Sequence, residues 1–412
     1  MKISIFSDLH FGCNSNSKLE NDSFDNAEEA VEKSLQSDLI LIAGDIFDNR
    51  FPKPDVWAKV LKILSKPTMQ EDSGIKLIEP INKNMNKISE RALKGIPVLT
   101  LHGTHERLGK DHNAIEALEL TGFVFHLHMN GLVFEKNGIK VAIQGMSGVP
   151  ERYAKQVMDR WNPQPIKDCY NILMLHQSID PYVYSPLEPP SLNTSNLPQG
   201  FDLIVNGHIH SSIVDKVGKT NILLTGSTIV TQLKKEEAIN PKGIHNLYLP
   251  ENKFDFVPLD NTRRFFYEET VEDEKKTFPD QIRRKLNSIL QNNYKKIPIV
   301  RFKIKGKRFD VVDRELKKIN DEYENKIILK FVKEIESEDI ANKIELLKKM
   351  RSGENIPIEE LGLKVMNEIL SEMKFSKHFD ANYVFGLLSE GQVDKTLDIL
   401  TGDQNTLTSF TR

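Results

Sequence analysis

The hydrophobic positions in the first 270 residues fall into seven short runs, separated by polar segments. Each run is rich in Ile, Leu and Val and ends in Gly or a polar residue, which is typical of strands buried on both faces. Between the runs, residues 55–65 place Val56, Val60 and Leu64 at helical spacing. This alternation predicts an α/β layered fold. The runs are residues 2–7, 38–44, 97–102, 140–145, 170–176, 201–207 and 220–226.

The pattern changes at about residue 271, where the polar stretch "TVEDEKKTFPD" predicts a linker. A helix over 279–292 and a strand over 296–306 are predicted next, followed by a further helix and strand to about 332. From 335 the apolar residues recur at helical spacing almost throughout. We therefore expect three parts, which are a main domain (1–270), a small α+β domain (271–334) and a helical region (335–412).

Composition sets limits without naming a function. The 412 residues are 39% hydrophobic and 28% charged, which is ordinary for a soluble protein. A net charge of −3 gives no global signature of nucleic-acid binding, so contact with DNA would need local patches or a partner. Two cysteines, Cys13 and Cys169, cannot form a disulfide framework or a thiolate metal site. With no long apolar run and no signal peptide, we expect a cytoplasmic protein without a membrane span.

Aspartate and histidine residues gather at the ends of the predicted strands. Ligand and catalytic groups in α/β folds collect just beyond the carboxyl ends of strands, so this clustering favours one shared site. A single such residue is more often structural, but a whole series that ends successive runs is hard to produce by chance. The residues are Asp8 and His10 after the first run, Asp45 after the second, His105 after the third, His176 after the fifth, and His208 and His210 after the sixth.

The residue types and their spacing point to divalent cations. Mixed imidazole and carboxylate ligands suit Mn²⁺, Fe²⁺ or Zn²⁺ better than Mg²⁺ or Ca²⁺, which prefer oxygen alone. The D-x-H and H-x-H spacings put two side chains on the same side of an extended segment. Two cations about 3.5–4 Å apart can bind a phosphate, generate hydroxide and stabilise the leaving oxygen. We therefore predict a two-metal site for phosphoester hydrolysis, with Mn²⁺ favoured.

With these motifs the chain resembles the calcineurin-like metallophosphoesterases. Their pattern is D-x-H, G-D, G-N-H-[DE], H and G-H-x-H, and here it reads "SDLHFG", "AGDIFD", "GTHE", "MLHQ" and "NGHIH". Within that superfamily the chain looks most like the SbcD-type nucleases of DNA double-strand-break repair, through "GDIFDNRFPKPD", "GSTIVTQL" and "NTRRFFYEE". The resemblance implies a four-layer α/β/β/α core, a small capping domain that binds DNA, and C-terminal helices that bind a partner ATPase.

The resemblance also implies a role for each matching residue. His105 would lie on the leaving-group side as a proton donor or transition-state stabiliser, with Glu106 as an orienting acid. Asp48 and Arg50 would lie near the cations. Asp45 would bridge two cations, one held by Asp8, His10, Asp45 and His210 and the other by Asp45, His176 and His208.

One position departs from the family pattern. Thr104 stands where relatives carry an asparagine whose amide oxygen binds the second cation. The threonine hydroxyl branches from Cβ and is a weaker donor, so we expect weak ligation or ligation through water. His102 is a conceivable replacement, although packing or support of the site is the simpler interpretation. The hypothesis is a loosened second cation and a stronger dependence on Mn²⁺ concentration.

Two other functions stay open at this point. A protein phosphatase or nucleotide phosphodiesterase would use the same metals, and "GTHE" ends in Glu as phosphatases of the superfamily do, yet these lack the helical C-terminal extension. A catalytically weakened assembly subunit is the second alternative, because of Thr104. We favour a DNA exo- or endonuclease acting at DNA ends or breaks.

Partners follow from the same resemblance. The C-terminal helices, predicted at 337–350 and 356–374, would bind the coiled coil of an SbcC-type ABC ATPase. Two nuclease subunits would form a homodimer through helices of the core, for which 55–65 and 112–121 are the candidates. The basic stretch "KKIPIVRFKIKGKR" is a candidate phosphate contact, with a half-exposed strand equally plausible. The resemblance places such a protein in the cytoplasm, associated with the nucleoid.

Overall fold

The structure is a computed structural model. It describes residues 1–15, 17–107, 112–183, 191–271, 278–306 and 312–335, together with 363, 367 and 383–386. The chain divides into two compact units, Met1–Glu336 and Ser337–Arg412. The helices predicted at 337–350 and 356–374 lie almost wholly outside the described residues, so the fold described below is that of the first unit.

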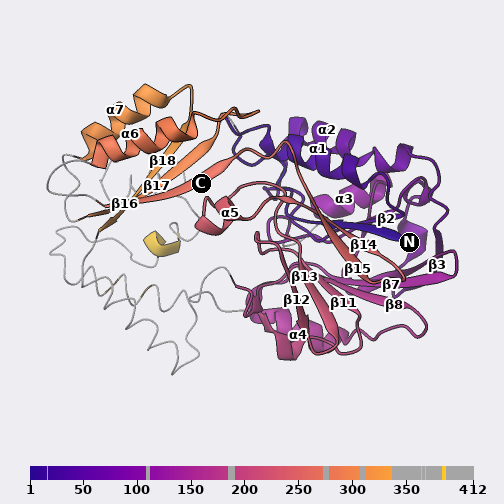
Figure 1. Ribbon diagram of the computed structural model, residues 1–412. Coiled ribbons are helices and arrows are strands. Elements are labelled where there is room, and N and C mark those ends of the chain that lie inside the picture. Colours follow the sequence, from indigo (N-terminus) through magenta and orange to yellow (C-terminus); the bar gives the residue numbers. More distant parts are fainter. Residues whose placement is uncertain are drawn as a thin grey trace, which may run out of the picture. The chain divides into compact units, whose positions relative to one another are not determined.

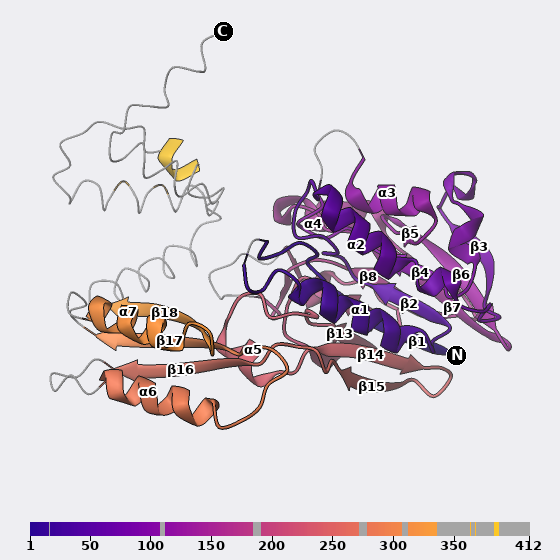
Figure 2. The same ribbon diagram turned by 90° about the horizontal axis from the view of Figure 1, so that it is seen from above.

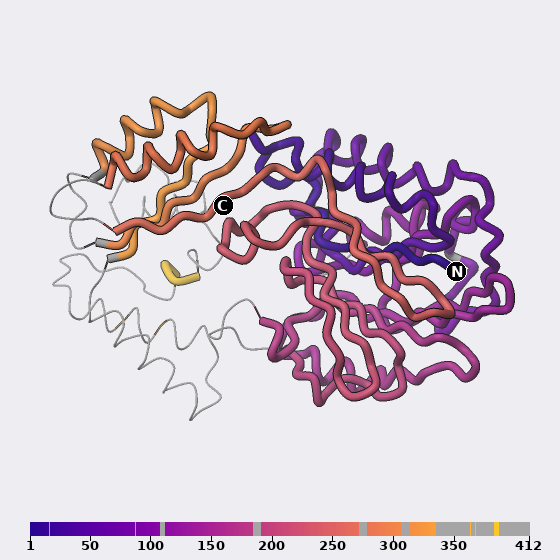
Figure 3. Tube along the Cα trace, in the orientation of Figure 1, coloured from indigo at the N-terminus to yellow at the C-terminus, as the bar shows by residue number. Residues whose placement is uncertain are grey.

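The first sheet has six strands in the order β15-β14-β1-β2-β4-β5. Strands β1, β2, β4 and β5 run parallel, and β14 and β15 extend the sheet beside β1 as an antiparallel hairpin. The hairpin comes from much later in the chain, as the trace in Figure 3 shows. The strands are β1 (Lys2–Phe6), β2 (Leu39–Ile42), β4 (Val98–Thr100), β5 (Phe125–His126), β14 (Gly243–Tyr248) and β15 (Lys253–Pro258).

The second sheet has seven strands in the order β12-β13-β11-β8-β7-β6-β3. Its central strands β13, β11, β8 and β7 are parallel, while β12, β6 and β3 are antiparallel to their neighbours. The strands are β3 (Lys76–Ile81), β6 (Asn130–Lys136), β7 (Ile139–Met146), β8 (Tyr170–Leu175), β11 (Leu203–Asn206), β12 (Ile213–Val217) and β13 (Thr220–Leu224), and a separate short pair is β9 (Ile179–Asp180) and β10 (Leu192–Asn193).

Three buried apolar clusters separate four layers of structure. In β2, Leu39 and Leu41 pack between the two sheets, while Ile40 and Ile42 pack outward against helices. Successive side chains of a strand point to opposite faces, so a strand covered on both sides needs a continuous apolar run, and "LILI" supplies one. The outer helices are α1 (Asp22–Ser34), α2 (Pro54–Leu64) and α3 (Ala114–Thr121) on the first sheet and α4 (Glu151–Trp161) on the second.

The predicted α/β/β/α arrangement is therefore confirmed (Figures 1 and 2). Shorter helices join these elements, and no helix in the described part of the chain is long and apolar enough to cross a membrane. The short helices are α5 (Lys235–Ile239) and the 3₁₀ turns η1 (Pro67–Met69), η2 (Met85–Lys87), η3 (Glu90–Leu93) and η4 (Thr194–Asn196).

A small three-stranded sheet follows the core. Its strands β16 (Phe265–Val271), β17 (Ile299–Gly306) and β18 (Ile328–Ile335) are all parallel, joined by α6 (Phe278–Ile289) and α7 (Val312–Tyr323). Both helices pack into one apolar cluster with Val300, Phe302 and Ile304 of β17. The first strand of this sheet begins before residue 271, inside the range expected for the main domain. The proposed boundaries at 270 and 334 stay a prediction.

Candidate metal centre

The aspartate and histidine residues predicted for a metal site meet where the two sheets present the carboxyl ends of their parallel strands. Asp8 and His10 follow β1 and Asp45 follows β2 in the first sheet, while His176 follows β8 in the second. A hydrogen bond of 3.2 Å from the His208 backbone N–H to Asp8 Oδ2 joins the two edges. The fold thus brings residues that are 200 positions apart in sequence into one cluster.

The first group consists of Asp8, His10 and His210, all of them buried. The Nε2 atoms of His10 and His210 are 3.2 Å apart, and Asp8 Oδ1 lies 3.5 Å from His210 Nε2 and 3.9 Å from His10 Nε2. The other nitrogen of His210, Nδ1, lies 2.5 Å from the Thr231 hydroxyl. A partner on one ring nitrogen fixes the ring and directs the other nitrogen to the cation.

The second group consists of Asp45, His176 and His208. His176 Nε2 lies 3.2 Å from Asp45 Oδ2, while His176 Nδ1 donates a hydrogen bond of 2.6 Å to the Ala43 carbonyl. A carbonyl accepts only, so the proton of a neutral His176 sits on Nδ1 and Nε2 is free to bind a cation. Asp45 and His176 therefore have the tautomer and spacing that cation ligands need.

The backbone at these positions is unusual. Asp8, His10, Asp45 and His208 have positive φ angles of 54°, 46°, 48° and 72°, a left-handed region that L-residues with a side chain seldom adopt. Gly44 precedes Asp45 with φ of 92°, and a Cβ there would come within 2.4 Å of His176 Nδ1. Strained backbone of this kind clusters at functional sites, because the surrounding structure must hold it in place.

The donor set fits divalent cations. Asp8 Oδ1 and His176 Nε2 are buried, and the polar atoms beside them are themselves members of the two groups, His210 Nε2 at 3.5 Å and Asp45 Oδ2 at 3.2 Å. A buried polar atom needs a partner, and a bound cation would satisfy both of these atoms. Within each group the ligand atoms all lie within 4.8 Å of one another. Imidazole and carboxylate ligands in this mixture suit Mn²⁺ and related transition metals.

The charges in the cluster also favour the binding of a cation. Burial raises the pKa of the Asp45 carboxyl, but His176, His10 and His105 together outweigh burial and hold that pKa well below its usual range. Burial lowers the pKa of His176, but the Asp45 carboxylate, Asp8 and the Ala43 carbonyl together outweigh it and raise the pKa to about 9. The cluster therefore has negative charge that attracts protons, and a cation would compete with those protons for the same atoms.

Thr104 lies at the edge of the second group and contacts Asp45. Its hydroxyl donates to Asp45 Oδ2 at 3.1 Å, with Oδ1 at 3.4 Å, and the His105 backbone N–H donates to Oδ1 at 3.0 Å. Gly103 makes this approach possible, because a Cβ there would lie 2.0 Å from Asp45 Oδ1. The loop thus binds the carboxylate that is expected to bridge two cations.

His105 lies at the rim, with its side chain 41% exposed. Its Nδ1 lies 2.8 Å from the Asp48 carbonyl oxygen and 3.9 Å from Asp48 Oδ1, and its ring packs edge-on against His10 at 4.9 Å between centroids. Asp48 Oδ1 is also 3.3 Å from His10 Nδ1, and His10, Asp48 and His105 form a third group whose atoms could hold a cation.

Glu106 lies where two loops of the site meet. Both of its oxygens accept backbone N–H groups, from Phe47 and from Gly103, each at 2.7 Å. In the described part of the chain Glu106 joins these two loops and makes no hydrogen bond to His105, so its role as an orienting acid stays a prediction. Burial, and then the charge of Asp45, raises the pKa of the Glu106 carboxyl to about 8.

His102 and Arg50 lie beside the cluster. His102 Nδ1 is 2.9 Å from His126 Nε2, and His102 belongs to none of the cation groups found among the described residues. Arg50 is exposed and, with His102 and Thr104, lines a cavity of about 570 Å³. Two further residues hold His210 in place and were not predicted from the sequence spacing. The Thr231 hydroxyl contacts the His210 ring, and the buried Lys242 donates to the His210 carbonyl.

A double sheet with aspartate and histidine groups converging at its strand ends defines the class of metal-binding phosphoesterases. The chain belongs to the calcineurin-like phosphoesterase family, whose sequence pattern matches residues 1–212.

Curated relatives extend the likeness beyond that range. The double-strand break repair protein mre-11 of Caenorhabditis elegans is 24% identical over 296 residues, which cover 63% of this chain and 40% of that protein. The double-strand break repair protein MRE11 of Encephalitozoon cuniculi is 26% identical over 317 residues, 72% of this chain and 54% of that protein. This chain thus spans about half or less of the relatives' lengths.

Solved structures are more distant. A putative 5′-nucleotidase from Staphylococcus aureus matches over 70% of this chain and 58% of its own, with 13% identity and a TM-score of 0.35. A TM-score at this level supports no argument.

Proposed function

We propose that this chain is a DNA nuclease dependent on divalent cations, hydrolysing phosphodiester bonds at DNA ends or breaks. The observation that carries the proposal is the set of three adjoining Asp/His groups, one of which includes His105, in a chain whose relatives are named as double-strand break repair proteins. One cation would be held by Asp8, His10, Asp45 and His210, and a second by Asp45, His176 and His208. When bound, such cations supply positive charge for the phosphate and lower the pKa of water.

His105 would act on the leaving group. Its Nδ1 is hydrogen-bonded to the Asp48 carbonyl, which can only accept, so a protonated ring keeps an Nε2–H to give to the departing oxygen. Exposure at the rim lets substrate reach this ring. A positioned acid of this kind contributes about 10²–10⁴-fold to rate. Asp48 is then a positioning residue, because it contacts His105 and His10 and not the leaving group.

The finer features of the proposal rest on the family resemblance. They are Mn²⁺ as the cation, exo- or endonucleolytic action on DNA, an SbcC-type coiled-coil ATPase bound by the C-terminal helices, and a homodimer formed through α2 and α3. Exposed or half-exposed apolar residues on or near these helices, among them Trp57, Leu61 and Leu120, are compatible with a partner there. A cytoplasmic, nucleoid-associated location belongs to the same proposal.

Release of nucleotides from labelled duplex DNA with Mn²⁺, compared with release of phosphate from a phosphopeptide, tests the substrate. We expect DNA to be cut, and His105→Ala to lower that rate by about 10²–10⁴-fold while cation binding persists. His112→Ala is the matched control, since the His112 side chain is exposed and pairs with Glu116 of α3. Preference for the phosphopeptide would favour a phosphatase. Cutting unaffected by His105→Ala would contradict the assigned role.

A further inference from the structure

The cavity beside the metal centre is not used by the chemistry described so far. It measures about 570 Å³, which lies in the range of small-ligand sites. It lies between the loop after β4, which carries His105, and Val157 of α4, and its walls include Gly148, Val149 and Pro150 from the turn that leads into that helix. Thr104 joins the cavity to the cluster, because its hydroxyl hydrogen-bonds to Asp45.

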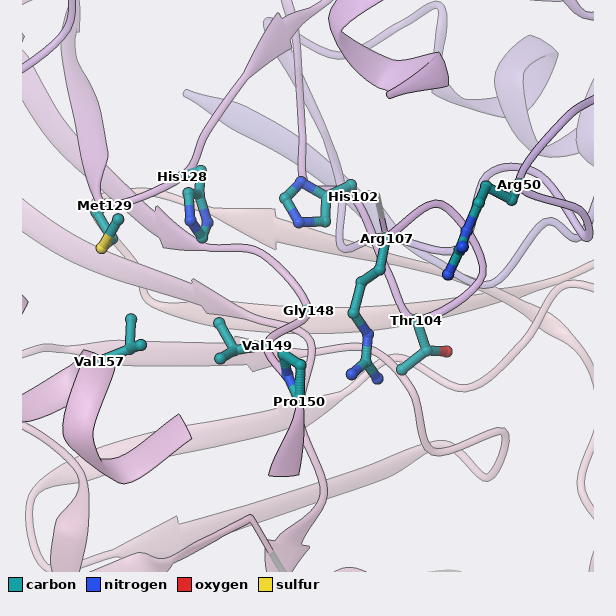
Figure 4. Close-up of a pocket in the computed structure, with 10 residues that line it drawn as sticks. All are labelled: Arg50, His102, Thr104, Arg107, His128, Met129, Gly148, Val149, Pro150 and Val157. Carbon is teal, nitrogen blue, oxygen red and sulfur yellow. The ribbon is translucent and has the colours of Figure 1, made fainter. Parts of the chain in front are cut away.

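The lining is polarised along its length. Figure 4 shows Arg50, Thr104 and Arg107 at one end and Met129 and Val157 at the other. Arg107 Nη2 lies 3.4 Å from the Glu151 carboxylate, so Arg50 supplies the unshared positive charge at this end, which adjoins the metal centre where a phosphate would lie. The far end is apolar and suits a group that leaves water readily. A ligand that is anionic at one end and flat and weakly polar at the other matches this order.

Two buried nitrogens at the cavity have no hydrogen-bond partner among the described residues. They are Arg107 Nε and His128 Nδ1. His128 is half-buried, and its ring lies 5.2 Å from that of His102, so imidazole faces as well as aliphatic groups line the cavity. Buried donors and acceptors without partners mark places where a ligand can hydrogen-bond. A nucleobase offers both the flat face and the edge groups that these walls would meet.

We propose that this cavity is a subsite for one unstacked nucleotide, with its phosphate beside Thr104 and the two arginines and its base against Val149 and Val157. The proposal rests on the proposed function and refines its substrate. A base inside a duplex cannot enter a cavity of this size without leaving its stack, which costs a few kcal/mol in intact DNA and least in single strands or frayed ends. The preferred substrate is then a strand with an unpaired nucleotide at the cut.

Binding measurements on the 412-residue chain with Mn²⁺ separate the contribution of the base to affinity from that of the phosphate. Calorimetry would compare inorganic phosphate with deoxyadenosine 5′- and 3′-monophosphates and with phosphoserine. At least one mononucleotide should bind about tenfold or more tightly than inorganic phosphate, because burial of a base against Val149 and Val157 with the His128 ring beside it removes apolar surface from water and lets the base stack on imidazole. Equal affinities, or the same gain for phosphoserine, would overturn the assignment to a nucleotide.

Filling the cavity provides the control. Val157→Trp should remove the nucleotide's advantage over phosphate, whereas Gln156→Trp, on the exposed face of the same helix, should keep it. Met129→Trp fills the cavity from a partly exposed position and replaces Val157→Trp if that variant fails to fold. An advantage that survives in the folded filled variants would overturn the proposal. Because no cleavage is measured, loss of this advantage and loss of nuclease activity are distinguishable results.

Discussion

At the scale of single residues, Thr104 ties a loop to a proposed cation ligand. Its hydroxyl already donates to Asp45, so in this structure the side chain supports the carboxylate. Thr104→Asn would offer an amide oxygen that reaches further from the backbone. We expect the Mn²⁺ concentration for half-maximal nuclease activity to fall by about tenfold, the lower end of effects from residues around metal ligands.

A Mn²⁺ titration of activity measures this shift. Thr68→Asn is the control, since Thr68 is a half-buried threonine whose hydroxyl bonds to the Ser65 carbonyl away from the site. Superimposable curves for the wild type and Thr104→Asn would disprove the idea of a loosened second cation.

The contacts of Glu106 predict that it contributes to stability. Its two oxygens each accept a backbone N–H, and Glu106→Gln would turn an NH₂ group toward one of these donors. We expect a loss of about 1–3 kcal/mol in the free energy of unfolding, the cost of leaving a buried polar group unsatisfied. Urea unfolding measures it, with exposed Glu236→Gln as a control expected within about 0.5 kcal/mol of the wild type. Equal stability of the Glu106→Gln variant would contradict the role given to Glu106.

At the scale of elements, the sequence predicts best what is buried on both faces. All seven predicted apolar runs are strands, because a strand between two layers needs apolar residues in succession. The other strands of the core, β3, β5, β6, β9, β10, β12, β14 and β15, were not predicted. β12 and β15 lie at sheet edges and carry polar residues such as Asp215 and Asp255, so their apolar runs are broken, whereas β6 and β14 lie inside their sheets and were missed although they are largely buried.

In the site, too, some features could be predicted from the sequence and others could not. Strand-end position was enough to single out Asp8, Asp45 and His176, since the carboxyl edge of a sheet is visible in sequence. Thr104's bond to Asp45 and Glu106's bond to Phe47 depend on how separate loops meet, and no local pattern encodes that meeting.

The segment around α5 supports His210 from two sides. Lys242, almost fully buried, donates to the His210 carbonyl at 3.1 Å and to Glu237 at 3.0 Å, and Glu237 also accepts the Thr231 backbone N–H at 3.2 Å. The Thr231 hydroxyl in turn contacts the His210 ring at 2.5 Å. One buried ion pair therefore fixes both the backbone and the ring of a proposed ligand.

Lys242→Met would leave Glu237 buried without its partner. We expect a loss of about 3–5 kcal/mol in stability. Cation affinity should fall by about 10–100-fold in whatever fraction stays folded, because a residue that orients a ligand is lost. Lys155→Met removes an exposed pair with Asp159 and should cost under about 1 kcal/mol. Unfolding and Mn²⁺ calorimetry give both quantities, and unchanged affinity would show that the pair is only structural.

Three histidines near the cavity predict acid sensitivity. Burial, followed by neighbouring charges, lowers the pKa of His102 to about 3, and burial also lowers the pKa of His126 and of His128. Below about pH 6.5 these histidines then take up protons in the unfolded chain but not in the folded one. Their titration therefore leaves the free energy of unfolding unchanged above that pH and lowers it as the pH falls. Each contributes up to about 1.4 kcal/mol per pH unit.

Urea unfolding at pH 7.5 and 5.5 in EDTA tests this. His128→Gln should lose about 1 kcal/mol less between the two pH values than the wild type does. His112→Gln, at an exposed position, should match the wild type. A His128→Gln variant as acid-sensitive as the wild type would contradict the assignment.

At the scale of the whole molecule, ligands from both sheets meet at one place. A cation bound there links the two edges of the double sheet, and it binds only the folded chain with full affinity. Mn²⁺ at 100 times its dissociation constant should therefore raise the free energy of unfolding by about 2.7 kcal/mol relative to EDTA. Thermal unfolding measures the gain, and Asp45→Asn should remove most of it. Identical melting in Mn²⁺ and EDTA would contradict the metal centre itself.

The left-handed backbone of Asp8, His10, Asp45 and His208 has a consequence for how such a chain changes over generations. Each of these conformations costs about 1–2 kcal/mol, which the fold must recover elsewhere. Replacing one of these residues with glycine would relax that cost, so a lineage freed from the need to bind cations could gain heat resistance as it lost activity.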